Sequence, residues 1–258
     1  MKFQLLPTTF DENGQASARQ HLACMVIDDR VAIDAGSLAM ATTDEQKKKI
    51  RDVILTHAHL DHIAGLPLYV DDLFAVLTEP ICVHATEEVI QTLERDVFNW
   101  SVYPRFSELR NEFSEVLSYH PFQVGEEFIV AHLKITPIEV NHKVPTVGFM
   151  VSDYKTKIAI TGDTAETDKF WESVNREENL DALFIECAFP AKLTELACAS
   201  HHLTPKVLQR ELTKFKHQNC RVYAINLKPM YREEIVRELE DLKINNLRVL
   251  EVGKIYDL

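Results

Sequence analysis

The chain has 258 residues, of which 46% are hydrophobic and 26% charged, so it can bury a globular core. Its 28 basic and 40 acidic residues give a formal net charge of -12, which argues against a long nucleic acid as the main partner. Phosphate backbones are bound by clustered Lys and Arg. No apolar run approaches the ~18 residues of a membrane span, and the first seven residues hold no long apolar segment, so neither a membrane partner nor a cleaved signal is expected.

The five cysteines form no C-x-x-C pair, and their number is odd. This pattern predicts reduced thiols, mostly in the core, and excludes a fold held together by disulfides. We therefore expect a cytoplasmic protein.

Strands and amphipathic helices alternate in the first half of the chain. Strands are predicted at 22–27, 31–34, 53–56 and 81–84, and helices at 43–51 and 62–70. Another helix is predicted to begin at Thr86, because Glu87 and Glu88 in its first turn suit the positive end of the helix dipole.

The second half repeats this mixture. Strands are predicted at 128–140, 146–151, 157–161, 182–185 and 222–225, with a final strand pair in 247–256. Helices are predicted at 166–178, 205–217 and 233–243, the second opened by Thr204 as N-cap and Pro205 at the first helical position. Two such halves indicate an α/β (α+β) fold of two sheets packed face to face with helices outside. No linker separates the halves, so residues 1–258 are predicted to form one domain.

The most informative segment is the turn His57-Ala58-His59-Leu60-Asp61-His62, which follows a buried strand. Imidazole and carboxylate groups suit zinc, manganese or iron. His57 and His59 alternate, so on an extended segment both rings point the same way, while Asp61 and His62 can face a second metal. A surface loop with chance histidines is the alternative, but such a loop would not usually follow a Val-Ile-Leu strand.

The pattern His57-x-His59-x-Asp61-His62 resembles the signature of the metallo-β-lactamase superfamily. The resemblance implies a four-layer αββα sandwich with a site for one or two divalent metals. It makes His142 the third histidine ligand, Asp163 a bridging carboxylate and Asp34 a residue that supports the ligands from behind. Taken singly, His142 and Gly162-Asp163-Thr164 are also compatible with an ordinary loop; their order after the first motif favours metal binding.

The segment His202-Leu203-Thr204-Pro205 resembles the one that supplies a catalytic histidine in the phosphodiesterase branches of this superfamily. The departure from the family pattern is Asn226, which stands where the last metal-ligating histidine is expected. A carboxamide oxygen is a weaker ligand than imidazole, so Asn226 is a weak or lost ligand. The second metal is then loosely held, or is a harder ion such as manganese, or the chain is an inactive relative.

His57 to Leu66 is most similar to the class II cyclic-nucleotide phosphodiesterase signature. A second similarity to that family, over residues 97–106, suggests Phe98, Asn99 and Trp100 as a substrate-binding wall, together with His202; ordinary core packing explains these aromatics equally well.

The resemblance implies hydrolysis of a small 3′,5′-cyclic nucleotide (cAMP or cGMP) by a water that two metals activate, zinc first, with manganese or iron as alternatives. Asp61, Asp163 and His202 would be catalytic, with His202 the general acid. A homodimer is compatible with this fold. A tRNA 3′-processing nuclease, a lactone or thioester hydrolase, and a non-catalytic nucleotide-binding relative weakened by Asn226 remain the alternatives.

Overall fold

The computed structural model describes residues 1–258, which form two compact units. Unit 1 comprises residues 1–123 and 252–257, and unit 2 comprises residues 124–251 and Leu258. Each unit contains a seven-stranded sheet. The prediction of a single domain stays a prediction.

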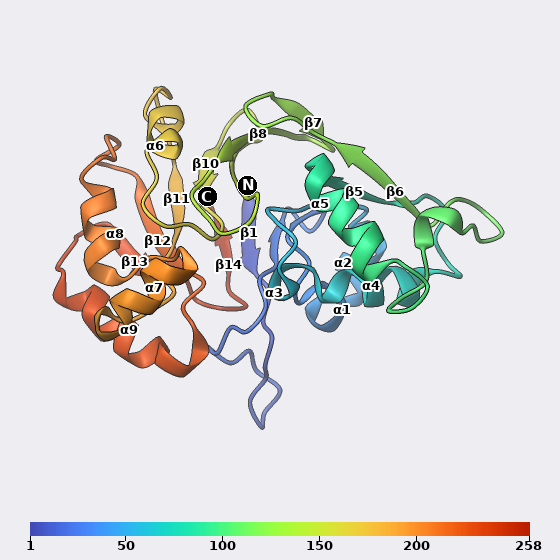
Figure 1. The fold of residues 1–258 in the computed structure, drawn as a ribbon, viewed down its shortest axis with the longest axis horizontal. Helices are drawn as coiled ribbons and strands as arrows, with labels where there is room; N and C mark the ends of the chain where they lie inside the picture. The colour runs from blue at the N-terminus through green and yellow to red at the C-terminus, as the bar shows by residue number, and fades with distance from the viewer. The chain divides into compact units, whose positions relative to one another are not determined.

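The sheet of unit 1 has the strand order β14-β1-β2-β3-β4-β5-β6. Its strands are β1 (Lys2–Leu5), β2 (Met25–Ile27), β3 (Val31–Ile33), β4 (Asp52–Ile54), β5 (Ile81–Ala85), β6 (Leu117–Pro121) and β14 (Ile255–Asp257). Neighbours from β14 to β3 run antiparallel, and neighbours from β3 to β6 run parallel. The two ends of this unit meet where β14 pairs with β1, red beside blue in Figure 1.

Short helices cover one face of this sheet. They are α1 (Leu38–Ala41), α2 (Asp44–Lys49), α3 (Leu60–Ile63), α4 (Gly65–Leu73) and α5 (Glu87–Thr92), followed by a π-helical turn (Leu93–Val97) and a 3-10 turn (Phe106–Glu108). Alternate strand residues such as Val53 and Val83 pack with Leu66 and Tyr69 of α4 in one apolar cluster. Burial of these apolar side chains stabilises this side of the sheet.

The sheet of unit 2 has the order β13-β12-β11-β10-β9-β8-β7. Its strands are β7 (Phe128–Val130), β8 (Leu133–Glu139), β9 (Val147–Ser152), β10 (Lys157–Ile160), β11 (Ala182–Glu186), β12 (Arg221–Ile225) and β13 (Leu247–Val249). Neighbours from β7 to β10 are antiparallel, and neighbours from β10 to β13 are parallel.

The helices of unit 2 are α6 (Lys169–Val174), α7 (Thr194–Ser200), α8 (Pro205–Leu212) and α9 (Arg232–Asp241), with 3-10 turns at Ala191–Leu193 and Pro229–Tyr231. In Figure 1, α7, α8 and α9 lie beside β11, β12 and β13. Leu183 and Val222 of the strands share an apolar cluster with Phe170, Leu208 and Ile235 of the helices.

Two details of the predicted elements are wrong, and a third is confirmed in position only. The last two strands do not pair with each other, because β13 joins β12 in unit 2 and β14 joins β1 in unit 1. The predicted strand 128–140 is two strands, since Ala131 turns the chain with a φ of 52°. Thr86 and Thr204 occupy the predicted N-cap positions, but their side chains make no capping hydrogen bond.

All five cysteines are free, as predicted, and Cys24, Cys187 and Cys220 are buried. None of the helices is long and apolar enough to cross a lipid bilayer.

Candidate functional site

The histidine-rich turn of unit 1 lies where two parallel strands end. Asp34 follows β3 and Thr56 follows β4, and β3 pairs with β4, so the two residues lie side by side. The buried Asp34 carboxylate accepts hydrogen bonds from the backbone N–H and the hydroxyl of Thr56, each at 2.9 Å. The same carboxylate lies 2.7 Å from Nδ1 of His62. Asp34 therefore orients the His62 ring, and its predicted role behind a metal ligand stays a prediction.

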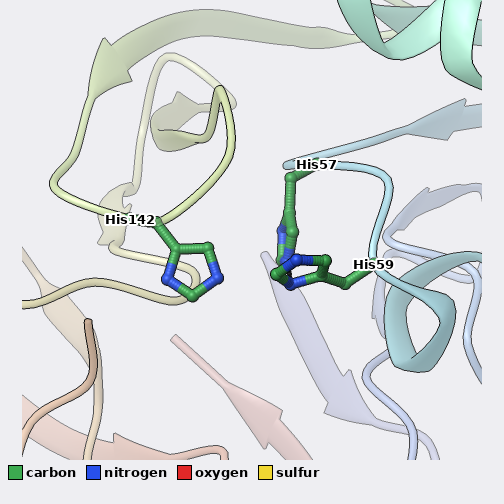
Figure 2. A group of neighbouring side chains, drawn as sticks. All are labelled: His57, His59 and His142. Carbon is green, nitrogen blue, oxygen red and sulfur yellow. Dashed lines mark hydrogen bonds between the residues drawn. The ribbon is translucent and has the colours of Figure 1, made fainter. Parts of the chain in front are cut away.

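His57, His59 and His62 bring their rings together in this turn. Nε2 of His57 lies 3.0 Å from Nδ1 of His59, and the His57 and His62 ring centroids are 4.1 Å apart. Two nitrogen ligands of one tetrahedral zinc ion are about 3.3 Å apart, given bonds of roughly 2.0–2.1 Å. The His57–His59 spacing therefore suits a shared ion. Figure 2 shows these two side chains on the segment after β4, and His142 on the loop after β8.

Asp61 is tied through its backbone to the segment before β2, and His62 to the loop after β3. Its carbonyl accepts a hydrogen bond from the N–H of Ala23 at 2.8 Å, and its half-buried carboxylate lies 3.9 Å from Nε2 of His62. The His62 carbonyl accepts from the N–H of Ala35 at 2.7 Å. These backbone bonds fix the start of α3, and with it the direction of both side chains.

Three polar residues of unit 2 gather at one edge of its sheet, the predicted Asp163 and Asn226 together with Glu186. Asp163, Glu186 and Asn226 stand at or just beyond the carboxyl ends of the neighbouring strands β10, β11 and β12. Carboxyl ends of parallel strands meet at one edge, which is where open α/β sheets bind ligands. His142 comes from the loop after β8, and His202 lies two residues before Thr204, the N-cap of α8.

His142, Asp163 and His202 form a group of potential metal donors. Their ligand atoms all lie within 4.8 Å of one another, and Asp163 is only 3% exposed. Nδ1 of His142 donates to the His201 carbonyl at 3.1 Å, so Nε2 carries the lone pair that a metal needs. His201 itself has a φ of 56° at the end of α7, and this left-handed turn presents its carbonyl to His142.

Glu186 is a buried partner of His202 that the sequence analysis missed. It has no exposed surface, and its carboxylate accepts from Nδ1 of His202 at 2.8 Å. Burial raises the pKa of Glu186, although the bond from His202 opposes the shift. Burial lowers the pKa of His202, but the hydrogen bond and charge of Glu186 outweigh it and leave the pKa raised. The sequence did contain a signal for Glu186, since a carboxylate ends the otherwise apolar strand Ala182–Glu186.

Asn226 contacts the predicted bridging carboxylate directly. Its Nδ2 donates a hydrogen bond to Oδ1 of Asp163 at 2.7 Å. The backbone of Asn226 is left-handed, with a φ of 56°, a conformation that asparagine adopts more readily than most residues.

The predicted substrate wall is only partly on the surface. Phe98 has no exposed surface and packs in the core beside Phe106, so it cannot contact a substrate, and that prediction is wrong. The Asn99 side chain bonds within its own loop, donating to the carbonyl of Arg95 and accepting from the N–H of Val102. Trp100 is 56% exposed, and its predicted contact with substrate stays a prediction.

The donors of both units fit a divalent metal. They are imidazole nitrogens and carboxylate oxygens, which suit zinc, manganese and iron. The rings of His62, His142 and His202 each have Nδ1 bonded to a carboxylate or a carbonyl, the arrangement found behind metal-ligating histidines.

The chain matches a known family over most of its length. A family model described as "Beta-lactamase superfamily domain" matches residues 29–218. Among curated proteins, a probable 3′,5′-cyclic-nucleotide phosphodiesterase of Yersinia pestis is 25% identical over 188 residues, which cover 66% of this chain and 52% of that protein. A nuclear ribonuclease Z of Triticum aestivum is 28% identical over 107 residues, covering 41% and 57%. The matches therefore span about half the length of these relatives.

Solved structures of other proteins superpose on nearly the whole chain. Unliganded yeast PDE1 has a TM-score of 0.78 at 16% identity, covering 100% of this chain and 99% of that one. The metallo-β-lactamase fold protein YhfI from Bacillus subtilis has a TM-score of 0.72 at 15% identity, covering 99% and 98%. These neighbours confirm the metallo-β-lactamase fold that the sequence predicted. With this fold and a family match across residues 29–218, the chain belongs to the beta-lactamase superfamily.

Proposed function

We propose that this chain is a metal-dependent phosphodiesterase that hydrolyses 3′,5′-cyclic nucleotides to 5′-nucleotides. The observation that carries the proposal is the pair of His202 and buried Glu186, set beside His142 and Asp163. A phosphodiester needs a proton for its leaving oxygen and a cation for its phosphate, and this group of residues offers both a proton donor and metal donors.

The proposed metal ligands are the donors that the sequence singled out, with zinc as the first expectation and manganese or iron as alternatives. They are His57, His59, Asp61, His62, His142 and Asp163. A bound divalent ion would neutralise charge on the phosphate and lower the pKa of a bound water.

His202 is the proposed general acid. Glu186 holds Nδ1 of the ring, so the proton on Nε2 is the one that can pass to the 3′ oxygen as the bond from phosphorus to that oxygen breaks. The new bond forms between phosphorus and the oxygen of the attacking water. Because Glu186 raises the pKa of His202, more of the imidazole carries this proton at neutral pH. Asp163, buried next to His202, would accept a hydrogen bond from the water and orient it.

A small cyclic nucleotide is the proposed substrate. Relatives named as 3′,5′-cyclic-nucleotide phosphodiesterases support it, from Yersinia pestis and Aliivibrio fischeri. The net charge of -12 disfavours a long polyanion, although relatives named ribonuclease Z or tRNase Z keep tRNA 3′ processing as the second candidate. Five free cysteines support the proposal that the chain acts in the cytoplasm.

The test is hydrolysis by purified chain reconstituted separately with zinc and with manganese. We expect release of AMP or GMP from the 3′,5′-cyclic nucleotides, abolished by a chelator and restored by the metal. Cleavage of a precursor tRNA at its 3′ end without cyclic-nucleotide turnover would favour the second candidate. Nucleotide binding by calorimetry with no turnover of either substrate would identify a non-catalytic relative.

A further inference from the structure

Asn226 holds a metal-donor carboxylate by a hydrogen bond. The side-chain N–H points at Oδ1 of Asp163 at 2.7 Å, and Asp163 is almost fully buried. An amide N–H is a donor and has no lone pair for a cation, whereas the carboxylate can accept from it and still bind a cation through its other oxygen. The observed contact is therefore that of a residue behind a ligand.

The same arrangement recurs at the neighbouring donors of unit 2. Nδ1 of His142 bonds the carbonyl of His201, and Nδ1 of His202 bonds Glu186. Together with Asn226, these partners give each of His142, Asp163 and His202 one supporting hydrogen bond. Such bonds fix the direction of a ligand before the metal arrives.

The backbone keeps Asn226 in this position. The Ile225 carbonyl accepts from the N–H of Cys187 at 3.0 Å, and the N–H of Lys228 donates to the carbonyl of Ala188 at 3.2 Å. Bonds on both sides of Asn226 thus tie the end of β12 to the end of β11. The left-handed turn between them, with a φ of 56°, sets the direction of the side chain.

We propose that Asn226 is a positioning residue, which orients the Asp163 carboxylate for a divalent cation and is not itself a ligand. This proposal rests on the metal centre of the proposed function and replaces the weak ligand expected from the sequence. It predicts that Asn226 acts on the metal only through Asp163.

The test is a double-mutant cycle on metal binding without substrate. Metal-free protein is titrated with Co²⁺ by calorimetry and by visible absorption, in the wild type, Asn226→Gly, Asp163→Ala and the double variant. Glycine removes the side chain without straining the left-handed backbone. Asn246→Gly is the matched control, because Asn246 also donates its side-chain N–H, to the Cys220 carbonyl just before β12 and away from the donor group.

We expect Asn226→Gly to weaken Co²⁺ binding by about 10- to 100-fold, with the same number of ions per chain and the same absorption spectrum at saturation. In the Asp163→Ala background the same substitution should change affinity by less than about 2-fold, because its effect passes through Asp163. Equal losses in both backgrounds, fewer bound ions, or an altered saturated spectrum would show that Asn226 is a ligand.

If Asn226→Gly proves unstable, Asn226→Ser keeps a donor of shorter reach, and the same cycle is run with it. Unchanged affinity in both single variants at position 226 would remove Asn226 from any role toward the metal. None of these measurements uses a nucleotide, so failure of the phosphodiesterase assay leaves their outcome intact.

Discussion

The carboxylate of Glu186 is fully buried, and hydrogen-bond donors surround it. Its two oxygens accept from the N–H groups of Thr164, Ala188 and Leu203, at 2.7, 3.1 and 3.2 Å, and from the ring of His202. Four donors offset the cost of burying the carboxylate. The result is a rigid link between the end of β11 and the histidine that precedes α8.

Because of these four donors, Glu186→Gln is expected to be far from conservative. The glutamine NH₂ group would face N–H donors, and each donor left without an acceptor costs about 1–3 kcal/mol, so we expect a loss of about 2–4 kcal/mol in the free energy of unfolding. Urea denaturation followed by circular dichroism measures this loss. Exposed Glu172→Gln is the control and should stay within about 0.5 kcal/mol. A change that small in Glu186→Gln would mean that the network is not formed.

His202→Ala is expected to slow cyclic-nucleotide turnover by about two to four orders of magnitude, because the leaving oxygen loses its proton donor. The metal content, measured by atomic emission, should stay at the wild-type value. The control is His217→Ala, whose ring bonds the carbonyl of Val174 outside the donor group. Normal turnover in His202→Ala would remove the residue from acid catalysis, and a loss of metal would make it a ligand.

Residues in short motifs were predictable, whereas the contacts that Glu186 and Asn226 make were not. His57, His59 and His62 lie within six consecutive positions, so their spacing alone predicts that they cluster. Glu186 and Asn226 act on His202 and Asp163, which lie 16 and 63 positions away in the sequence. Only the pairing of β10, β11 and β12 creates those contacts.

At the scale of elements, the start of α3 depends on one position without a side chain. A Cβ on Gly36 would lie 2.0 Å from the carbonyl oxygen of Asp61 and 2.8 Å from the backbone of Ala23. The loop after β3 and the start of α3 therefore approach as closely as two backbones can. This contact sets the position of the turn that carries the predicted ligands.

Gly36→Ala is accordingly expected to push the start of α3 away, because neither backbone can yield by a side-chain rotation. We expect metal affinity to fall by at least about 10-fold, because the turn 57–62 would no longer hold the predicted ligands in position. Competition with a chelating dye measures this affinity. Gly14→Ala is the control: its φ of 76° makes it a strained position for alanine, but no heavy atom lies within 4 Å of the added Cβ. Equal metal affinity in the two variants would contradict the role of Gly36.

The strands and helices were predictable where apolar periodicity marked a buried face. Val53, Val83 and Val222 lie in strands that the sequence located, and each belongs to an apolar cluster. Lys2–Leu5 and Leu117–Pro121 gave no such signal, and both form strands at or near a sheet edge. The pairing partners of β13 and β14 could not be predicted from the sequence, because strands adjacent in sequence usually pair with each other and these two do not.

For the whole molecule, two buried thiols test whether the chain unfolds as one domain. Cys24 lies in unit 1 and Cys187 in unit 2, and burial raises the pKa of both thiols. In native protein a thiol reagent should therefore label exposed Cys198 first. Labelling along a urea gradient, read by mass spectrometry of peptides, should show both buried thiols reacting at one midpoint. Two separate midpoints would contradict the single domain.

The pairing of β14 with β1 also constrains how the molecule is made. Unit 1 begins at the first residue, yet its edge strand Ile255–Asp257 is translated only after the whole of unit 2. Until then β1 presents open backbone groups on the ribosome, and an open strand is a template for pairing with another chain. A chain truncated before Val252 would keep every predicted metal ligand but would leave the edge of β1 exposed. We therefore expect such a chain to aggregate during synthesis.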